Sequence, residues 1–319
     1  HNLDIFLPLG ISFFTFQQIA CLVDTYHGKL GVMPFRHYAL FVSFFPQLIA
    51  GPIVLADKII PQFSDKKIFC LSWKSICVGL TLFSIGLFKK VIIADTFSSW
   101  TALAFEAEHP LTLLEAWGGA LAYTIQLYFD FSGYSDMALG LASFFNIKLP
   151  LNFNSPYKAK SIIDFWRRWH MTLSAFLRDY LYIPLGGNRK GKARRYVNLM
   201  ATMLLGGLWH GAGWTFILWG ALHGFMLTVN HWFRALVKGS AGEMFMNSAP
   251  MRFLCATLTF FCINWCWVIF RAQTLDGARR VFEAMFGLPD AAGAVDGGPL
   301  NGAVGMARIM PNGYVAGWE

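Results

Sequence analysis

Long apolar runs limit what this chain can fold into more than any other feature of its sequence. A helix needs about 20 apolar residues to cross a hydrocarbon core of roughly 30 Å. Since lipid leaves no water to satisfy backbone polar groups, such runs predict helices. Only 14% of the 319 residues are charged, against about 25% in soluble domains. The sequence therefore predicts an all-α, polytopic integral membrane protein whose apolar runs cover residues 3–23, 37–55, 71–93, 111–145, 196–233 and 253–270.

Three of these runs are irregular. Runs 111–145 and 196–233 are too long for one perpendicular crossing, so each is either a tilted or broken helix or a pair of closely connected helices. Run 37–55 contains Pro46, Gly51 and Pro52, which interrupt helical hydrogen bonding. Such backbone needs partners in protein or water, so we expect this segment to be re-entrant or broken and to line a cavity.

The net charge of +8 does not point to nucleic acid. The basic residues lie in short loops between apolar runs, where membrane topology places them, and the loop 189–195 is the strongest cytoplasmic marker. We therefore expect membrane lipids, not nucleic acid, around this chain. The six cysteines form no CxxC pair and have no histidines at zinc-ligand spacing, so no metal or bound cofactor is expected.

Residues 161–182 predict an amphipathic helix at the membrane interface. Ser161 is a suitable N-cap, and the tryptophans Trp166 and Trp169 share its apolar face. Arg167 and Arg168 lie on the opposite, polar face. His170 falls at the edge of the apolar face, so we expect its ring to point inward.

Two histidines in apolar surroundings are the candidate catalytic residues. His170 lies in FWRRWHMTLS and His210 in GGLWHGAGW. An unpartnered polar ring buried among apolar residues costs free energy. Because burial disfavours the charged form, His210 is expected to be a neutral imidazole, suited to general-base catalysis of acyl transfer. A histidine satisfied within the core is an equally weighted alternative.

Other polar or small residues within the apolar runs also have two interpretations. Asp130 and Asp136 either take part in function or make structural hydrogen bonds at a kink. Gly206, Gly213 and Gly220 recur every seven residues, with Gly224 near the same face. They favour close helix packing over a groove for an acyl-thioester arm. Signatures of serine hydrolases, zinc proteases and P-loop nucleotide binding are absent from the sequence.

Four motifs occur in one order along the chain: FFPQLIAGPI at 44–53, YFDFSGYSDMALGLA at 128–142, FWRRWHMTLSAFLRDYLYIPLGGNR at 165–189 and MLLGGLWHGAGWTFILWGALHG at 203–224. Together they resemble the membrane-bound O-acyltransferase family, and within it the bacterial branch that acts on polysaccharides such as alginate. The resemblance covers residues 3 to 285. In that family the WHG histidine is the proposed catalytic residue, which corresponds to His210, and the RRWH histidine, here His170, lies across the reaction tunnel.

The resemblance implies a ring of tilted and broken helices around a central funnel, in the inner membrane of a bacterium. It implies transfer of an acetyl group from a cytosolic donor, acetyl-CoA, toward a periplasmic acetyltransferase or acceptor protein of an exopolysaccharide complex. The tunnel-lining candidates are Trp166, Trp169, Trp209, Trp214, Asp130 and Asp136. The candidates for binding the donor's phosphates are Arg167 and Arg168, although membrane topology alone also explains basic residues there and is the favoured explanation.

Three further expectations complete this interpretation. Residues 1–319 are expected to form one partial membrane domain with a Gly-rich tail at 286–319, truncated at both ends and without a signal peptide. The alternatives are transfer of D-alanyl or another acyl group to a cell-wall polymer, or a transporter that moves an acyl carrier without bond chemistry. A structural subunit without activity is disfavoured by the paired WHG and RRWH motifs.

Overall fold

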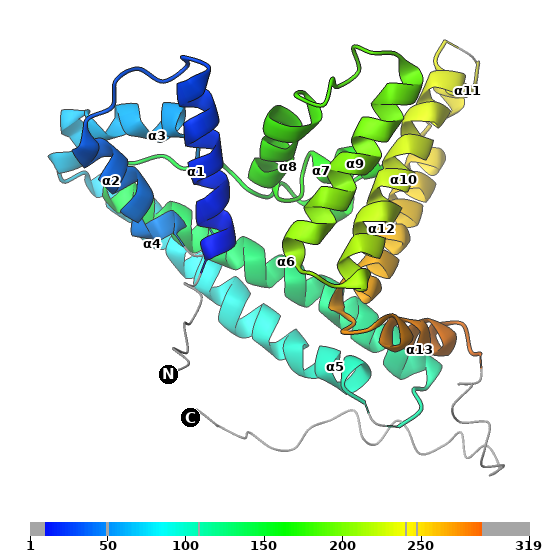
Figure 1. The fold of residues 1–319 in the computed structure, drawn as a ribbon. Helices are drawn as coiled ribbons and strands as arrows, with labels where there is room; N and C mark the ends of the chain where they lie inside the picture. Colours follow the sequence, from blue (N-terminus) through cyan, green and yellow to red (C-terminus); the bar gives the residue numbers. More distant parts are fainter. Residues whose placement is uncertain (1–9, 49–50, 108, 240, 247, 289–319) are drawn as a thin grey trace, which may run out of the picture.

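The computed structural model describes residues 10–48, 51–107, 109–239, 241–246 and 248–288, and within these the chain forms helices and turns without a strand (Figure 1). The all-α prediction is confirmed for this part of the chain. Most of the tail expected at 286–319 lies outside the described residues. The elements, with 3-10 and π segments as η, are α1 Ile11–Tyr26, α2 Phe35–Ser43, η1 Phe45–Gln47, α3 Ala56–Phe63, η2 Lys66–Phe69, α4 Trp73–Phe88, η3 Lys89–Ala94, α5 Asp95–Phe105, α6 Leu113–Phe144, η4 Pro156–Lys158, α7 Ile162–Trp166, α8 Met171–Leu177, η5 Arg178–Tyr182, α9 Lys192–His210, α10 Trp214–Val237, α11 Ala241–Met246, α12 Ala249–Arg271 and α13 Leu275–Met285.

Two long helices lie side by side and support the other elements (Figure 1). One is α6, whose 32 residues extend about 48 Å, so it has to tilt within a bilayer. Of the forms expected for run 111–145, the structure shows the single long helix. The other is the continuous stretch α4, η3 and α5. Their close crossing depends on glycine, because a Cβ at Gly86 would lie 2.5 Å from the backbone oxygen of Gly133.

Run 196–233 forms the helix pair α9 and α10, joined by a short turn at Gly211 to Gly213 (Figure 1). A Cβ at Gly220 would lie 2.4 Å from the backbone oxygen of Met203, and one at Gly224 would lie 2.9 Å from the sulfur of Met200. The packing interpretation is thus confirmed at Gly220 and Gly224, where no groove for an acyl arm exists. Run 37–55 is broken, as expected: it contains most of α2, all of η1 and, at 51–55, irregular chain directly before α3.

The single amphipathic helix expected over 161–182 is wrong. The segment consists of two short helices, α7 and α8, followed by the π segment η5. His170 separates the two helices because its backbone adopts the left-handed conformation, with φ of 42°. Backbone hydrogen bonds to the loop 152–154 flank this residue: the N–H of Met171 donates to the oxygen of Asn152, and the N–H of Asn154 donates to the oxygen of Arg168, each at 2.9 Å. Tertiary contacts thereby override the helical periodicity of the sequence.

By length and composition, two helices in the described part of the chain are apolar enough to cross a membrane, Trp73–Phe105 and Ala249–Arg271. This number is smaller than the six runs expected. The helix α1 has only 16 residues, run 37–55 is broken, and α6 carries carboxylates at positions 115, 130 and 136. The ring and funnel implied by the resemblance stay a prediction.

Candidate active site

A cavity of about 490 Å³ lies between α1, the start of η3, the middle of α6, the turn before α8 and the adjoining ends of α9 and α12. His170 and His210, which are forty residues apart, both line it. The structure thus brings together the two histidines singled out from the sequence. The lining residues are Ser12, Phe13, Lys90, Leu127, Asp130, Phe131, Tyr134, Met137, His170, Trp209, His210 and Phe270.

The His170 ring is buried, with 2% of the residue exposed, and it is oriented by one side chain. Its Nδ1 lies 3.0 Å from Oδ1 of Asn152. The backbone N–H of Thr172 also points at this atom of Asn152, at 3.4 Å. Because a backbone N–H can only donate, the Asn152 atom must be the acceptor oxygen of the amide and not its nitrogen. His170 therefore carries its proton on Nδ1. Its Nε2 is buried without a hydrogen-bond partner in the described structure, so an acceptor lone pair is available there.

Asn152 is itself fixed on both sides. Its Oδ1 also accepts from the Thr172 hydroxyl at 3.0 Å, and its Nδ2 donates to Oγ of Ser135 on α6 at 3.3 Å. Thr172 Oγ1 in turn accepts from the backbone N–H of Ile53 at 3.0 Å. The interrupted segment 37–55 thus contributes to holding the histidine, through a network whose members are all buried.

His210 is held by aromatic contacts. It is the last residue of α9, directly before the turn at Gly211. Its ring packs edge to face against Phe270 at 5.0 Å and Trp219 at 5.2 Å between centroids. The adjacent Trp209 lies 4.7 Å away. In the described structure no hydrogen bond holds either ring nitrogen of His210, so its tautomer is not fixed by a partner.

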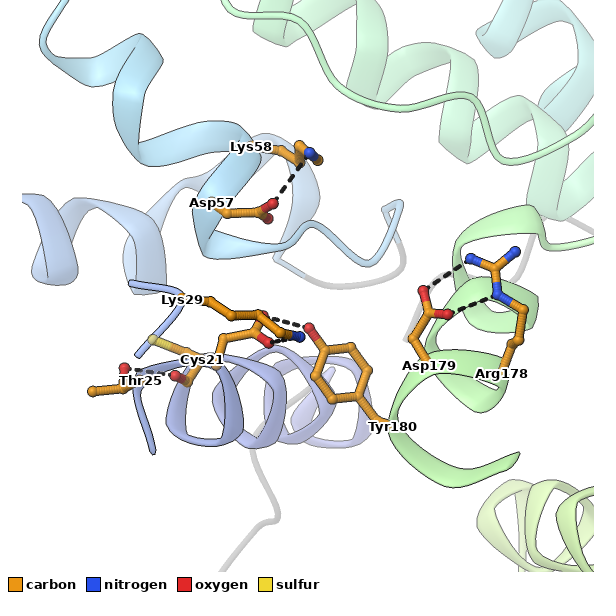
Figure 2. A network of polar contacts seen from close by, with 9 residues as sticks. Cys21, Thr25, Lys29, Asp57, Lys58, Arg178, Asp179 and Tyr180 are labelled. Atoms are coloured by element: carbon orange, nitrogen blue, oxygen red, sulfur yellow. Dashed lines mark hydrogen bonds and ion pairs between the residues drawn. The ribbon is translucent and has the colours of Figure 1, made fainter. Parts of the chain in front are cut away.

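The helix α1 closes one side of the cavity with Ser12 and Phe13. Its other end is attached to η5, because the Tyr180 hydroxyl donates a hydrogen bond to Asp24 (Figure 2). Lys29, in the loop after α1, pairs with the same carboxylate at 2.8 Å. That hydrogen bond raises the pKa of the Lys29 ammonium. The polar network at Asp24 thus holds α1 against the segment that carries His170.

The two aspartates of α6 pair with adjacent lysines of η3. Asp136 binds Lys89 at 2.6 Å, and Asp130 binds Lys90 at 2.8 Å. Only Asp130 and Lys90 line the cavity. The ion pair of Asp136 is consistent with the structural interpretation, and both interpretations of this residue stay predictions. Asp130 shares Lys90 with Asp95, which binds the same ammonium at 2.7 Å, so these three side chains keep one excess negative charge.

The four candidate tryptophans occupy different environments. Trp209 lines the cavity, as expected. Trp166 and Trp169 lie outside the cavity lining: Trp166 donates to Nδ1 of His223 at 3.2 Å, and Trp169 is packed in the core against Trp267. Trp214 is also outside it, since 74% of its surface is exposed at the start of α10. Of the four tryptophans, Trp209 alone thus lines the cavity in the described structure, and a tunnel lining by the other three stays a prediction.

The two candidate arginines also differ. Arg168 is occupied, because its Nε donates to Asp164 at 2.9 Å and its Nη1 to the backbone oxygen of Asn154. Arg167 is exposed, and no carboxylate pairs with it in the described structure. Of the two, only Arg167 keeps its guanidinium available for a phosphate.

Sequence reasoning missed Asn152. It occurs in the loop sequence LPLNFNSP, where nothing distinguishes the buried Asn152 from the exposed Asn154. His223 was ranked below the other two histidines, yet it is fully buried. Its Nδ1 accepts from Trp166, and Trp219 lies between its ring and that of His210.

Comparison with known proteins identifies the family. The model of the membrane-bound O-acyltransferase family matches residues 29–273. The chain is 50% identical over 312 residues to the peptidoglycan O-acetyltransferase of Helicobacter pylori, covering 90% of this chain and 58% of that protein. It is 47% identical over 286 residues to the probable alginate O-acetylase AlgI of Pseudomonas aeruginosa, covering 88% and 52%. With the teichoic acid D-alanyltransferase of Bacillus subtilis it shares 31% identity over 250 residues, covering 73% and 60%.

The chain thus spans little more than half the length of these curated relatives. The family match covers most of this chain, including both histidines and the segment that holds them. The chain belongs to the membrane-bound O-acyltransferase family, whose members are integral to membranes.

Proposed function

We propose that this chain forms the reaction centre of an O-acyltransferase that transfers acetyl groups for the O-acetylation of an exported polysaccharide. The observation that carries the proposal is the single cavity lined by the rings of His170 and His210. Acetyl transfer is favoured over D-alanyl transfer, because identity is 50% and 47% to relatives named as O-acetylating proteins and 31% to a D-alanyltransferase.

In the proposed reaction His210 acts as general base. A neutral ring nitrogen of His210 takes the proton of the acceptor hydroxyl while the hydroxyl oxygen attacks the thioester carbonyl carbon. Collapse of the tetrahedral intermediate breaks the carbon–sulfur bond, and the proton then passes from the imidazolium to the departing thiolate. The aromatic rings of Trp219 and Phe270 hold the imidazole in place and limit the access of water.

His170 has a narrower role. Because its proton is on Nδ1, its Nε2 accepts a hydrogen bond and has no proton to give to an oxyanion. It therefore orients a hydroxyl group in the cavity and does not stabilise the tetrahedral oxyanion. Asn152 acts through His170 and is a positioning residue.

The donor and the partners complete the proposal. Acetyl-CoA enters from the cytosol, and its phosphates bind Arg167 and the basic loop 189–195. The acetyl group reaches a periplasmic acetyltransferase or another acceptor protein of an exopolysaccharide complex, and the chain resides in the bacterial inner membrane. The names of the two acetylating relatives support a polysaccharide acceptor.

The test is transfer of radiolabelled acetyl from acetyl-CoA to polysaccharide by the purified full-length protein with its partner, in detergent. We expect His210→Ala to lower the rate by about 10² to 10⁴, with unchanged accumulation in the membrane. His27→Ala, in an exposed loop after α1, is the matched control. Transfer without a gradient identifies an enzyme instead of a transporter, and full activity of His210→Ala would remove His210 from the reaction.

A further inference from the structure

A cluster of arginines surrounds His231 at one end of the α9–α10 pair. Arg195, in the first turn of α9, lies with Nη2 2.6 Å from Nδ1 of His231 on α10. Since a guanidinium only donates, the His231 nitrogen accepts this hydrogen bond. Arg234, three residues further along α10, donates to Oγ of Ser161 at 3.3 Å. Arg167, directly after α7, also acts electrostatically on His231, as do Arg195 and Arg234.

The positive charge of this cluster is not compensated. In the described structure no carboxylate pairs with Arg167, Arg195 or Arg234, whereas Arg168, Arg178 and Arg271 each have such a partner. The acid that adjoins the cluster is Asp164, which binds Arg168 at 2.9 Å. Guanidinium groups within a Debye length of about 10 Å repel one another, so an anion bound among them lowers the free energy of this surface.

The cluster is well separated from the cavity. Arg195 and His210 are fifteen residues apart along α9, which corresponds to about 22 Å along the helix axis. The start of α9 and the end of α10 lie together at the end of the pair opposite the turn that follows His210 (Figure 1). The arginines are half-buried or exposed, so a ligand can reach them from outside the helix pair.

We propose that Arg167, Arg195 and Arg234 form a binding site for a phosphate group, with His231 orienting the guanidinium of Arg195. Planar guanidinium groups bind phosphate oxygens in pairs of parallel hydrogen bonds, which lysine does not offer. The phosphate belongs either to the acyl donor or to the headgroup of an anionic lipid. The first source rests on the proposed function, whereas the site itself does not.

Binding is tested on the purified full-length protein in neutral detergent with inorganic pyrophosphate as the probe. We expect the double variant Arg195→Gln, Arg234→Gln to weaken pyrophosphate binding by about a hundredfold, since each charge-assisted contact accounts for about tenfold or more. The double variant Arg36→Gln, Lys74→Gln is the matched control, because it removes the same two positive charges from exposed residues of α2 and α4. The control should change binding less than about threefold.

Two further measurements complete the test. His231→Phe should weaken pyrophosphate binding, whereas His231→Gln, which keeps an acceptor, should restore most of it. If the variant Arg195→Gln, Arg234→Gln raises the KM for acetyl-CoA, the phosphate belongs to the donor. If this variant weakens only the binding of phosphatidylglycerol vesicles, compared with phosphatidylcholine vesicles, the phosphate belongs to a lipid. Equal effects of the two double variants, Arg195→Gln, Arg234→Gln and Arg36→Gln, Lys74→Gln, would refute the site, even if acetyl transfer is confirmed.

Discussion

Replacing Asn152 with leucine removes the hydrogen-bond acceptor that orients the His170 ring while keeping the side-chain volume similar. Two buried donors then lose a hydrogen bond of 3.0 Å to Oδ1 of Asn152, Nδ1–H of His170 and the hydroxyl of Thr172, and the longer contact of the Thr172 backbone N–H at 3.4 Å is lost as well. An unsatisfied buried donor costs about 1 to 3 kcal/mol, so the free energy of unfolding should fall by about 2 to 6 kcal/mol.

Activity should fall independently of stability. Without Asn152 the proton of His170 moves between both ring nitrogens, and Nε2 no longer offers a fixed acceptor to the hydroxyl in the cavity. We expect kcat for acetyl transfer to decrease on the order of 10² per folded protein. Asn152→Asp keeps an acceptor oxygen facing Nδ1, and Ser135 can donate to its second oxygen after rotation of the hydroxyl. This variant should stay within about tenfold of the wild-type kcat.

The assay compares kcat and the midpoint of thermal unfolding for both variants, at a temperature well below the lowest midpoint. Asn154→Leu is the matched control, because this exposed residue makes no side-chain hydrogen bond in the described structure and lies two positions away. If folded Asn152→Leu transfers acetyl groups as fast as Asn154→Leu, the orientation of His170 by Asn152 has no part in the reaction and the reasoning is wrong.

Three other predictions concern packing, charge and exposure. Gly220→Ala places a Cβ 2.4 Å from a backbone oxygen of α9 and should lower the free energy of unfolding by about 1 to 3 kcal/mol, measured by chemical denaturation. Gly118→Ala adds a Cβ that meets nothing within 4 Å, so the free energy of unfolding should rise by about 0.5 to 1 kcal/mol in the same assay. Asp136→Asn leaves the Lys89 ammonium, whose side chain is 22% exposed, without its ion pair and should cost about 1 to 3 kcal/mol in the same assay. Trp214→Ala should leave acetyl transfer unchanged, because 74% of this residue is exposed and it lies outside the cavity lining; a tenfold loss in the transfer assay would contradict this assignment.

The sequence predicted the helical class and the two histidines because both depend on local signals. Apolar runs require helices in lipid whatever their tertiary contacts, and a histidine within such a run is conspicuous. The alternatives left open for runs 111–145 and 196–233 needed the structure, because a tilted helix and a helix pair have the same composition. Run 111–145 is one long helix, α6, which crosses α4 closely. Run 196–233 is a helix pair, because the glycine turn after His210 separates α9 from α10.

The environment of His170 was beyond sequence reasoning for a different reason. The helical pattern over 161–182 is real, but Asn152, which is distant along the chain, stabilises a left-handed residue in its middle. Hydrogen bonds between distant segments leave no periodic trace in either segment. The same reason explains Trp166 and Trp169, whose positions near the histidine in sequence did not place them in the cavity.

The charges around the cavity limit how the proposed reaction can proceed. Asp130 is paired with Lys90, and in the described structure no carboxylate hydrogen-bonds to His170 or His210. An imidazolium formed on His210 would therefore have no fixed counter-charge, and an ion unpaired among aromatic rings is costly. The developing oxyanion of the substrate is then its only partner. Both charges should arise and disappear together, which favours direct return of the proton to the departing sulfur over a long-lived charged intermediate. Two histidines that hydrogen-bond to no carboxylate, in one cavity lined largely by aromatic rings, thus suit a transfer that begins and ends without a charge on either imidazole.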